Sequence, residues 1–249
     1  MRVKGEPAYI LHHRNYGETS LILELFSRAY GRVGVVAKGA RKARSNKGMA
    51  LEPFQPMLAG WAGKGELKTL TDSEPGGMSL GLAGESLYCG FYLNELLLML
   101  LHRDDPHEVL FDKYHEAVTA LMGGDDNEIA LRLFEKNLLI EIGYSLVLDH
   151  EVENGQGIIP DQEYVYIQDS GPHIKDRKKS DQDDGWPIKG EALLALAEDR
   201  LNDNNVLRQV KGLMRTTISH RLEGKQLKSR ELLRSVMSLQ KSCIQEQEL

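Results

Sequence analysis

The hydrophobic pattern of the chain changes its period once, and this change limits the folds that the chain can adopt. Up to about residue 75, the apolar residues form short runs rich in Ile, Leu, Val and Tyr, separated by turn residues, which is typical of β-strands. After residue 84 they recur with helical spacing. The Gly- and Ser-rich stretch 74–86 lies between the two patterns. We therefore predict an α+β protein, with a β domain at 1–78 and a mostly helical domain at 79–249.

The β domain is predicted to be a small barrel. An insertion at 40–51, which could hold a short helix or an ordered loop, separates the third strand from the fourth. Five strands with an insertion at this point favour an OB-fold, a Greek-key barrel that binds oligonucleotides. An SH3-like barrel is the alternative interpretation. The predicted strands cover residues 8–16, 19–27, 31–39, 53–63 and 65–73.

The second domain is predicted to be a helical bundle with one interruption. Asp105 is a plausible N-cap before Pro106, and glycines end two of the helices. Residues 149–187 are polar and rich in Gly, Pro and acids, so we expect an irregular insertion with one hairpin near 163–168 and partial disorder at 175–185. The predicted helices cover residues 84–102, 106–122, 126–144, 189–201, 205–222 and 229–239.

The composition is that of a globular protein of a reducing compartment. The chain has 249 residues and a formal net charge of −6. No apolar run reaches the roughly 18 residues that a membrane span needs, and the first residues lack the apolar core of a signal peptide. The two cysteines, Cys89 and Cys243, are far apart and lie in no CxxC pair. We therefore expect a cytoplasmic protein without membrane contact.

Positive charge is concentrated near the N-terminus of this acidic chain. Residues 1–75 carry 12 Lys and Arg against 7 Asp and Glu, and the segment 35–48 contains five cations and no acid. Clustered cations attract phosphates independently of sequence, although a solvated loop is the alternative interpretation. We predict that a nucleic acid binds to Arg32, Lys38, Arg41, Lys42, Arg44 and Lys47.

Two further groups of residues are weaker candidates for nucleic-acid binding. Aromatic side chains in a basic groove can stack on bases, but most aromatics of a small barrel belong to its core. The candidates are Tyr9, Tyr16, Phe26, Tyr30, Phe54 and Trp61. A second basic cluster near the C-terminus is interleaved with glutamates, so a mixed-charge helix face is its alternative interpretation. Its predicted DNA-binding members are Lys225, Lys228 and Arg230.

The chain contains no recognisable catalytic signature. It has no phosphate-binding P-loop, no dinucleotide-binding GxGxxG, no nucleophile elbow and no HExxH metal motif. The cysteines are too few for a thiolate zinc site. We predict no catalytic residue, no metal and no cofactor, and hence a protein that is not an enzyme.

Several segments, in order, resemble the RecO family of bacterial DNA repair proteins. Each segment is only modestly specific, but their shared order and spacing cover almost the whole chain, most weakly at 149–187. The segments are ETSLILELFS, GRVGVVAKGARKARSNKG, LEPFQPMLAGWAGKGELKTL, LYCGFYLNELL, RLFEKNLLIEIGY and GKQLKSRELLR.

The resemblance implies a recombination mediator of the RecF pathway. Such proteins have an OB-fold followed by a helical domain, bind single- and double-stranded DNA, and anneal complementary strands without ATP. They act even on strands coated with single-stranded DNA-binding protein (SSB), and with RecR they help to load RecA. A non-catalytic adaptor between SSB and RecR is the alternative. The expected location is the cytoplasm, in association with the nucleoid.

The resemblance also implies one partner site and the absence of a metal. One branch of the family holds zinc with four cysteines in the region matching 149–187, where this chain has none, so it resembles the zinc-less branch. In such relatives the helical domain receives the acidic, apolar-ended tail of SSB. Arg132 matches an arginine implicated in that contact, with an apolar wall expected from the helices around 96–101 and 131–139.

Overall fold

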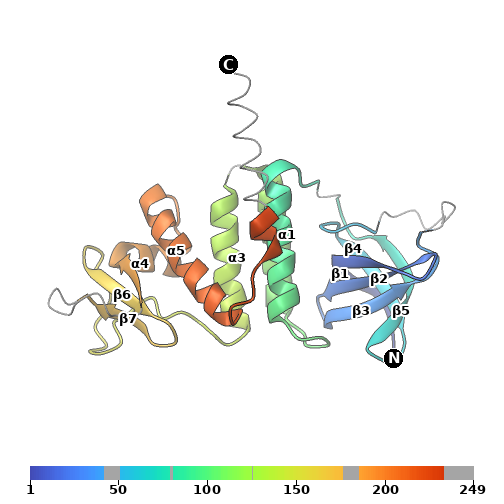
Figure 1. The fold of residues 1–249 in the computed structure, drawn as a ribbon, viewed down its shortest axis with the longest axis horizontal. Helices are drawn as coiled ribbons and strands as arrows, with labels where there is room; N and C mark the ends of the chain where they lie inside the picture. The colour runs from blue at the N-terminus through green and yellow to red at the C-terminus, as the bar shows by residue number, and fades with distance from the viewer. Residues whose placement is uncertain (42–50, 79–80, 125, 176–184, 233–249) are drawn as a thin grey trace, which may run out of the picture. The chain divides into compact units, whose positions relative to one another are not determined.

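The computed structural model describes residues 1–41, 51–78, 81–124, 126–175 and 185–232 (Figure 1). The chain divides into two compact units, one formed by Met1–Asp125 with Leu227–Leu249, the other by Asp126–Gln226. The first unit therefore combines the β-structure with two helices and the start of a last helix. The predicted boundary after residue 78 coincides with the change from strands to helices, and as a domain boundary it stays a prediction.

The first unit contains the predicted β-barrel. The barrel is closed in the order β1-β2-β3-β5-β4, and β3 pairs with β5 in parallel while the other neighbours are antiparallel. This closed five-stranded arrangement confirms the OB-fold and sets aside the SH3-like alternative. The strands, blue to cyan in Figure 1, are β1 (Arg2–Tyr16), β2 (Ser20–Ser27), β3 (Gly31–Ala37), β4 (Met57–Ala62) and β5 (Leu67–Pro75).

Alternation of apolar residues along the strands builds the barrel core. Trp61 lies fully buried in it, as do Leu23 and Val35. The register of β1 against β2 shifts between Ile10 and His12, and such a bulge bends a strand and re-aims its side chains. The core cluster consists of Val3, Ala8, Ile10, Leu23, Leu25, Val33, Val35, Ala37, Met57, Ala59 and Trp61.

Two helices of the same unit, α1 (Gly84–Leu100) and α2 (Glu108–Gly123), are joined to the barrel by a buried polar chain. The Asn94 amide donates to the carbonyl of Leu11 over 2.9 Å, and the Tyr114 hydroxyl donates to Asn94 over 2.6 Å. Burying such groups without partners would be costly, so these bonds fix how α1 and α2 meet the barrel. A last helix begins at 228 and is described as far as 232.

The predicted start of α2 was wrong. The N-cap is His107, whose carbonyl accepts the first helical bond from the amide of Phe111. Asp105 lies in the connection before it, which is held on the barrel: the Asp104 amide donates to the carbonyl of Arg32 over 2.9 Å. Because this connection pairs with β3, α2 begins at Glu108, two residues after the start at Pro106 that the local sequence signals predict.

The second unit packs helices around a small antiparallel sheet of order β7-β6-β8. The β6–β7 hairpin lies where one hairpin was expected, and the third strand was not predicted, since four residues are too few for a periodic signal. Gly212 of α5 brings the helix against Trp186, because a Cβ there would lie 1.9 Å from the indole. The elements are α3 (Asn127–Glu141), β6 (Glu163–Ile167), β7 (Gly171–Ile174), β8 (Trp186–Lys189), α4 (Gly190–Ala197) and α5 (Asn204–Arg221).

Two other expectations concern parts of the chain that the structure covers incompletely. The segment expected to be disordered falls mainly on 176–184, outside the described residues, and so does the insertion at 42–50. Among the helices that are described, none is both long and apolar enough to cross a lipid bilayer.

Candidate nucleic-acid interface

The outer face of the barrel presents its side chains in rows that run across the strands. Residues directly opposite each other on neighbouring strands share a face of the sheet, so the strand registers define the rows. We call the first row, which consists of Tyr9, Phe26 and Arg32, the covered row. The middle row consists of His12, Glu24, Gly34 and Leu67. The two open rows are Arg14 with Ile22, Val36 and Thr69, and Tyr16 with Ser20.

Helix α2 packs on the covered row. The ring of Tyr9 lies 5.0 Å from that of Tyr114 and 5.7 Å from that of Phe111, and Phe26 contacts the same two rings. Tyr9 and Phe26 are almost fully buried, and burial raises the pKa of the Tyr9 hydroxyl to about 12. These aromatics are therefore part of the core between barrel and helix, and they present no ring face to a base.

The middle row is occupied by an ion-pair network. The Glu24 carboxylate accepts hydrogen bonds from Arg32 over 2.9 and 3.2 Å and from Arg103 over 2.5 and 3.0 Å. Arg32 also donates to the carbonyls of Leu98 and Leu101, each over 2.6 Å. Burial disfavours the charge of Glu24, but the bonds and charges of Arg103 and Arg32 outweigh it and lower the pKa of the carboxyl.

A glycine on β3 lets the α1–α2 connection approach the barrel. A Cβ on Gly31 would lie 1.7 Å from the carbonyl oxygen of Asp105, and Gly31 has a φ of +62°. A Cβ on Gly34 would lie 3.0 Å from the Leu67 side chain and in ordinary contact, at 3.4 Å, with the guanidinium of Arg103, so the close approach of the connection rests on Gly31. Arg103 was not predicted as a member of this network, because it lies in the connection between two helices, far in sequence from Glu24. It remains 39% exposed at the side chain.

The guanidinium of Arg32 makes four hydrogen bonds to protein acceptors, all in this network. Its side chain is only 13% exposed. DNA binding by Arg32 stays a prediction, and the geometry favours a role in holding the α1–α2 pair against β3.

The open rows carry exposed polar and aromatic side chains. Arg14 and Tyr16 of β1 are both exposed, and Tyr16 retains 52% of its surface. They occupy alternate positions of one strand and therefore point to the same side. An exposed tyrosine beside an arginine provides a stacking surface and a phosphate contact of the kind that single-strand binders use. Arg14 was not among the predicted site residues.

The first part of the basic segment lies next to the open rows. Lys38 follows β3 directly and is exposed, as is Arg41. The Arg41 amide donates to the carbonyl of Thr19 over 2.9 Å, and its guanidinium reaches the carbonyl of Gly17 at 3.4 Å. The β1–β2 turn and the end of β3 therefore bring these cations to one end of the barrel. The remaining predicted cations of this segment, Lys42, Arg44 and Lys47, lie outside the described residues.

Of the six aromatic candidates, Tyr16 is the one with most of its ring exposed. Trp61 and Phe54 are buried, with 0% and 4% of their surface exposed, like Tyr9 and Phe26. Tyr30 packs edge-on against Trp61 at a ring distance of 5.5 Å. Trp61 and Tyr30 therefore belong to the barrel core, whereas Tyr9 and Phe26 pack against α2 and Phe54 packs against Phe91 of α1. Packing thus accounts for five of the six aromatics, only two of them in the barrel core itself.

The second basic cluster is divided between the two units. Lys225 is exposed and belongs to the second unit, whereas Lys228 and Arg230 belong to the first. The Lys228 amide donates to Glu95 of α1, and the Arg230 guanidinium donates to the Tyr92 hydroxyl over 2.9 Å. Lys228 keeps an exposed side chain, while Arg230 anchors the last helix to α1. Their contact with DNA stays a prediction.

Arg132 of α3 is buried. It is 4% exposed, and its guanidinium pairs with the fully buried Glu135 over 2.9 Å. Binding of the SSB tail by Arg132 stays a prediction, and it requires that the buried guanidinium become accessible to the terminal carboxylate of the tail.

One group of side chains in the second unit has the composition of a cation site. The ligand atoms of Glu151, Glu153 and His173 all lie within 4.8 Å of one another. The Glu151 carboxylate already accepts the amides of Glu153 and Asn154, each over 2.8 Å. These bonds lower the pKa of Glu151 and give the carboxylate a structural role in the turn, so we assign no metal to the group.

A closed five-stranded barrel with an exposed cationic end places the chain in the class of OB-fold proteins. The N-terminal model of Recombination protein O matches residues 1–77, and its C-terminal model matches residues 82–231. The chain belongs to the RecO family. A relative from Methylococcus capsulatus, named DNA repair protein RecO, is 46% identical over 94% of both chains. The protein of that name from Coxiella burnetii is 46% identical over 93% of this chain and 98% of its own length. The one from Nitrosococcus oceani is 43% identical over 96% of both chains.

Proposed function

We propose that this protein is a DNA repair and recombination mediator that binds single- and double-stranded DNA. It anneals complementary strands coated with SSB, and with RecR it helps to load RecA. The observation that carries the proposal is the exposed end of the barrel, where Arg14, Tyr16, Lys38 and Arg41 gather. Membership of the RecO family supports it, as does the name of the relatives, DNA repair protein RecO.

Electrostatic screening explains how such a surface promotes annealing. Two strands repel each other through their phosphates, and cations bound to one strand reduce that repulsion while releasing counterions. Base pairing then supplies the free energy, so the reaction needs no nucleotide hydrolysis. The protein acts without a catalytic residue, metal or cofactor in this scheme, and its site of action is the nucleoid in the cytoplasm.

Partner proteins localise the activity. The acidic, apolar-ended tail of SSB is proposed to bind the helical part of the chain, with Arg132 as the partner of its terminal carboxylate. RecR and, through it, RecA join at the coated gap. In the alternative, an adaptor, the chain would bridge SSB and RecR and the basic segment would have no part in annealing.

Annealing of two SSB-coated complementary strands, without ATP and across a salt series, tests the proposal. The wild type should anneal rapidly at low salt and lose activity as salt rises. A variant with Lys38, Arg41, Lys42 and Arg44 all replaced by alanine should bind single strands with a log–log salt slope reduced by about 3, at about 0.7 per lost phosphate contact. Its annealing should fall with its DNA affinity.

A matched control removes the same charge from the second unit. Lys175, Lys189, Arg208 and Arg215 are exposed there, and their replacement by alanine should leave the slope and the annealing rate unchanged. Unchanged annealing in the basic-segment variant would overturn the DNA role of that segment and leave the adaptor. If the wild type annealed naked strands but not SSB-coated strands, the contact with SSB would be overturned and the DNA-binding surface would stand.

A further inference from the structure

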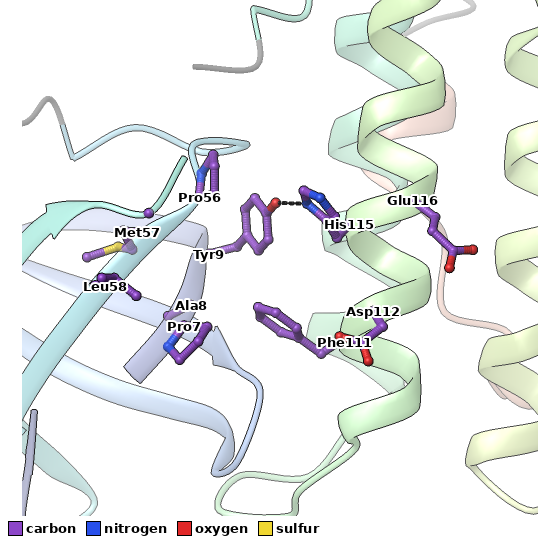
Figure 2. Close-up of a pocket in the computed structure, with 11 residues that line it drawn as sticks. Pro7, Ala8, Tyr9, Pro56, Met57, Leu58, Phe111, Asp112, His115 and Glu116 are labelled. Atoms are coloured by element: carbon purple, nitrogen blue, oxygen red, sulfur yellow. Dashed lines mark hydrogen bonds between the residues drawn. The ribbon is translucent and has the colours of Figure 1, made fainter. Parts of the chain in front are cut away.

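A pocket of about 370 Å³ lies between the barrel and α2, beside the covered row (Figure 2). Its floor is apolar: Pro7 comes from β1, Met57 and Leu58 come from the start of β4, and Phe111 comes from α2. Gly76 lets the chain after β5 approach the start of β4, because a Cβ there would lie 2.8 Å from the amide nitrogen of Met57. All of these residues belong to the first unit.

One wall of the pocket is polar, and its two polar side chains form a hydrogen bond with each other. The Tyr9 hydroxyl and the Nδ1 atom of His115 are 2.5 Å apart, and Figure 2 shows the two rings facing each other at the edge of the pocket. Tyr9 is buried whereas His115 is exposed.

Carboxylates lie near the pocket on both the helix and the barrel. On the helix side, Asp112 lines the pocket and Glu108 lies one turn before it on α2. On the barrel side, Glu74 lies opposite Leu58 in the β4–β5 register, so both point to the same face. Glu74 is exposed.

The cations nearby are fewer than the acids. Arg28 binds both Glu108 and Asp112, and Lys113 binds Glu116, whose carboxylate Figure 2 shows turned away from the pocket. The residues that line the pocket include no lysine or arginine. The opening therefore carries net negative charge, which repels phosphates and separates this surface from the proposed DNA-binding end of the barrel.

We propose that this pocket docks a segment of a partner protein that presents one bulky apolar side chain flanked on both sides by Lys or Arg. The apolar floor takes the anchor, as buried anchors do at the centre of protein interfaces. Asp112 and Glu108 on the helix side, and Glu74 beside Leu58 on the barrel side, favour a cation before and after it. β1 and β4 are paired with each other, so the partner adds no strand here and is recognised through its side chains.

The probe for this proposal is a fluorescein-labelled peptide of about twelve residues, with a central Leu-Trp pair between lysines. Two matched peptides carry Ala-Ala at the centre or glutamates at the flanks. Fluorescence anisotropy with the full chain should show that the Lys-flanked Leu-Trp peptide binds about tenfold tighter than either. Binding should also shift the imidazole NMR signal of His115.

Three variants localise the site. Leu58→Asp should weaken binding of the Lys-flanked peptide about tenfold and Glu74→Lys about fivefold. Glu85→Lys, an equal charge change at an exposed position of α1, should leave it within about twofold. Glu74→Lys should keep the wild-type annealing rate, so a failure of this proposal is distinguishable from a failure of the proposed DNA function.

Equal affinity of the three peptides would overturn the proposal, since the probe would then bind by charge alone or not at all. Loss of binding in Glu74→Lys with no loss in Leu58→Asp would also overturn it, because the apolar floor would then have no part.

Discussion

The covered row and the open rows belong to one face of the same strands, yet the arginine of the covered row is bonded within the protein whereas the arginine of the open rows is exposed to solvent. In the covered row, Arg32 makes four hydrogen bonds to a carboxylate and two carbonyls. In the open rows, Arg14 is exposed on the neighbouring strand. The difference teaches that the role of a cation in this barrel depends on which acceptors the helices bring to it.

The aromatic residues divide in the same way. Tyr9 is buried against α2, whereas Tyr16, seven residues further along β1, keeps half of its surface exposed. The α1–α2 pair covers one part of the barrel face, and Glu24 binds the two arginines at its margin. The end near the β1–β2 turn stays uncovered, with Glu18 of the turn as its exposed acid, and this end is the surface that we propose for a nucleic acid.

The largest effect is expected for the arginine that is buried most. Arg132→Ala leaves Glu135 buried without its ion-pair partner, which should lower the free energy of unfolding by about 3 kcal/mol. Urea denaturation monitored by circular dichroism measures this loss. The double variant Arg132→Leu with Glu135→Leu should recover most of it, because neither charge then remains buried.

The double variant also tests the role of Arg132 in binding SSB. If Arg132 receives the terminal carboxylate of the tail, the stable double variant should bind a fluorescent tail peptide at least about tenfold more weakly than the wild type. Wild-type affinity in that variant would make the arginine purely structural.

The next effect concerns the network that closes the middle row. Glu24→Gln removes the carboxylate that Arg32 and Arg103 share and should cost about 2 kcal/mol at pH 7, less than for a fully buried pair because Arg103 reaches solvent. Guanidinium denaturation measures the loss, and Glu18→Gln, at an exposed turn position, is the matched control. No loss would show that the network does not hold the α1–α2 pair.

The same variant has a defined pH dependence. In the folded state the pKa of the Glu24 carboxyl lies below its ordinary value of 4.5. The stability that the charged carboxylate contributes is therefore complete above pH 4.5 and is lost as the pH falls through the lower pKa of the folded state. The difference in unfolding free energy between wild type and Glu24→Gln should therefore shrink below about pH 4. A constant difference down to pH 3 would contradict this.

A smaller effect is expected in the open rows. Tyr16→Ala should weaken single-strand binding by about 1–2 kcal/mol if the ring stacks on a base, while duplex binding stays the same. Tyr16→Phe, which keeps the ring, is the control and should bind like the wild type. Fluorescence anisotropy with a labelled oligonucleotide measures all three proteins.

The smallest effect is that of a single phosphate contact. Arg14→Ala should reduce the log–log salt slope of single-strand binding by about 0.7. Arg28→Ala, which removes a cation paired with two carboxylates of α2, should leave the slope unchanged. Equal slopes for Arg14→Ala and the wild type would place the DNA path away from the open rows.

The barrel was predictable because its signals are local. Alternating apolar residues and glycine turns indicated all five strands, and the insertion after the third indicated the OB-fold. For the candidate site, the sequence predicted a basic loop, and Lys38 and Arg41 of that loop are exposed near the β1–β2 turn; their contact with DNA stays a prediction. The sequence did not indicate that Arg14 is exposed beside them, because it is a single cation on a strand. It did not indicate the contact of Arg103 with Glu24, because the two residues are far apart in the chain.

By itself, the sequence determined the order of strands and helices, the acidic charge with its basic segment, and membership of the RecO family. Periodicity and turn chemistry act over a few residues, so they can be read without knowing the fold. Only the tertiary structure decided which cations remain exposed. The pairing of Arg32 and Arg103 with Glu24 depends on the packing of α1 and α2 against the barrel, and no local pattern encodes a contact between such distant residues.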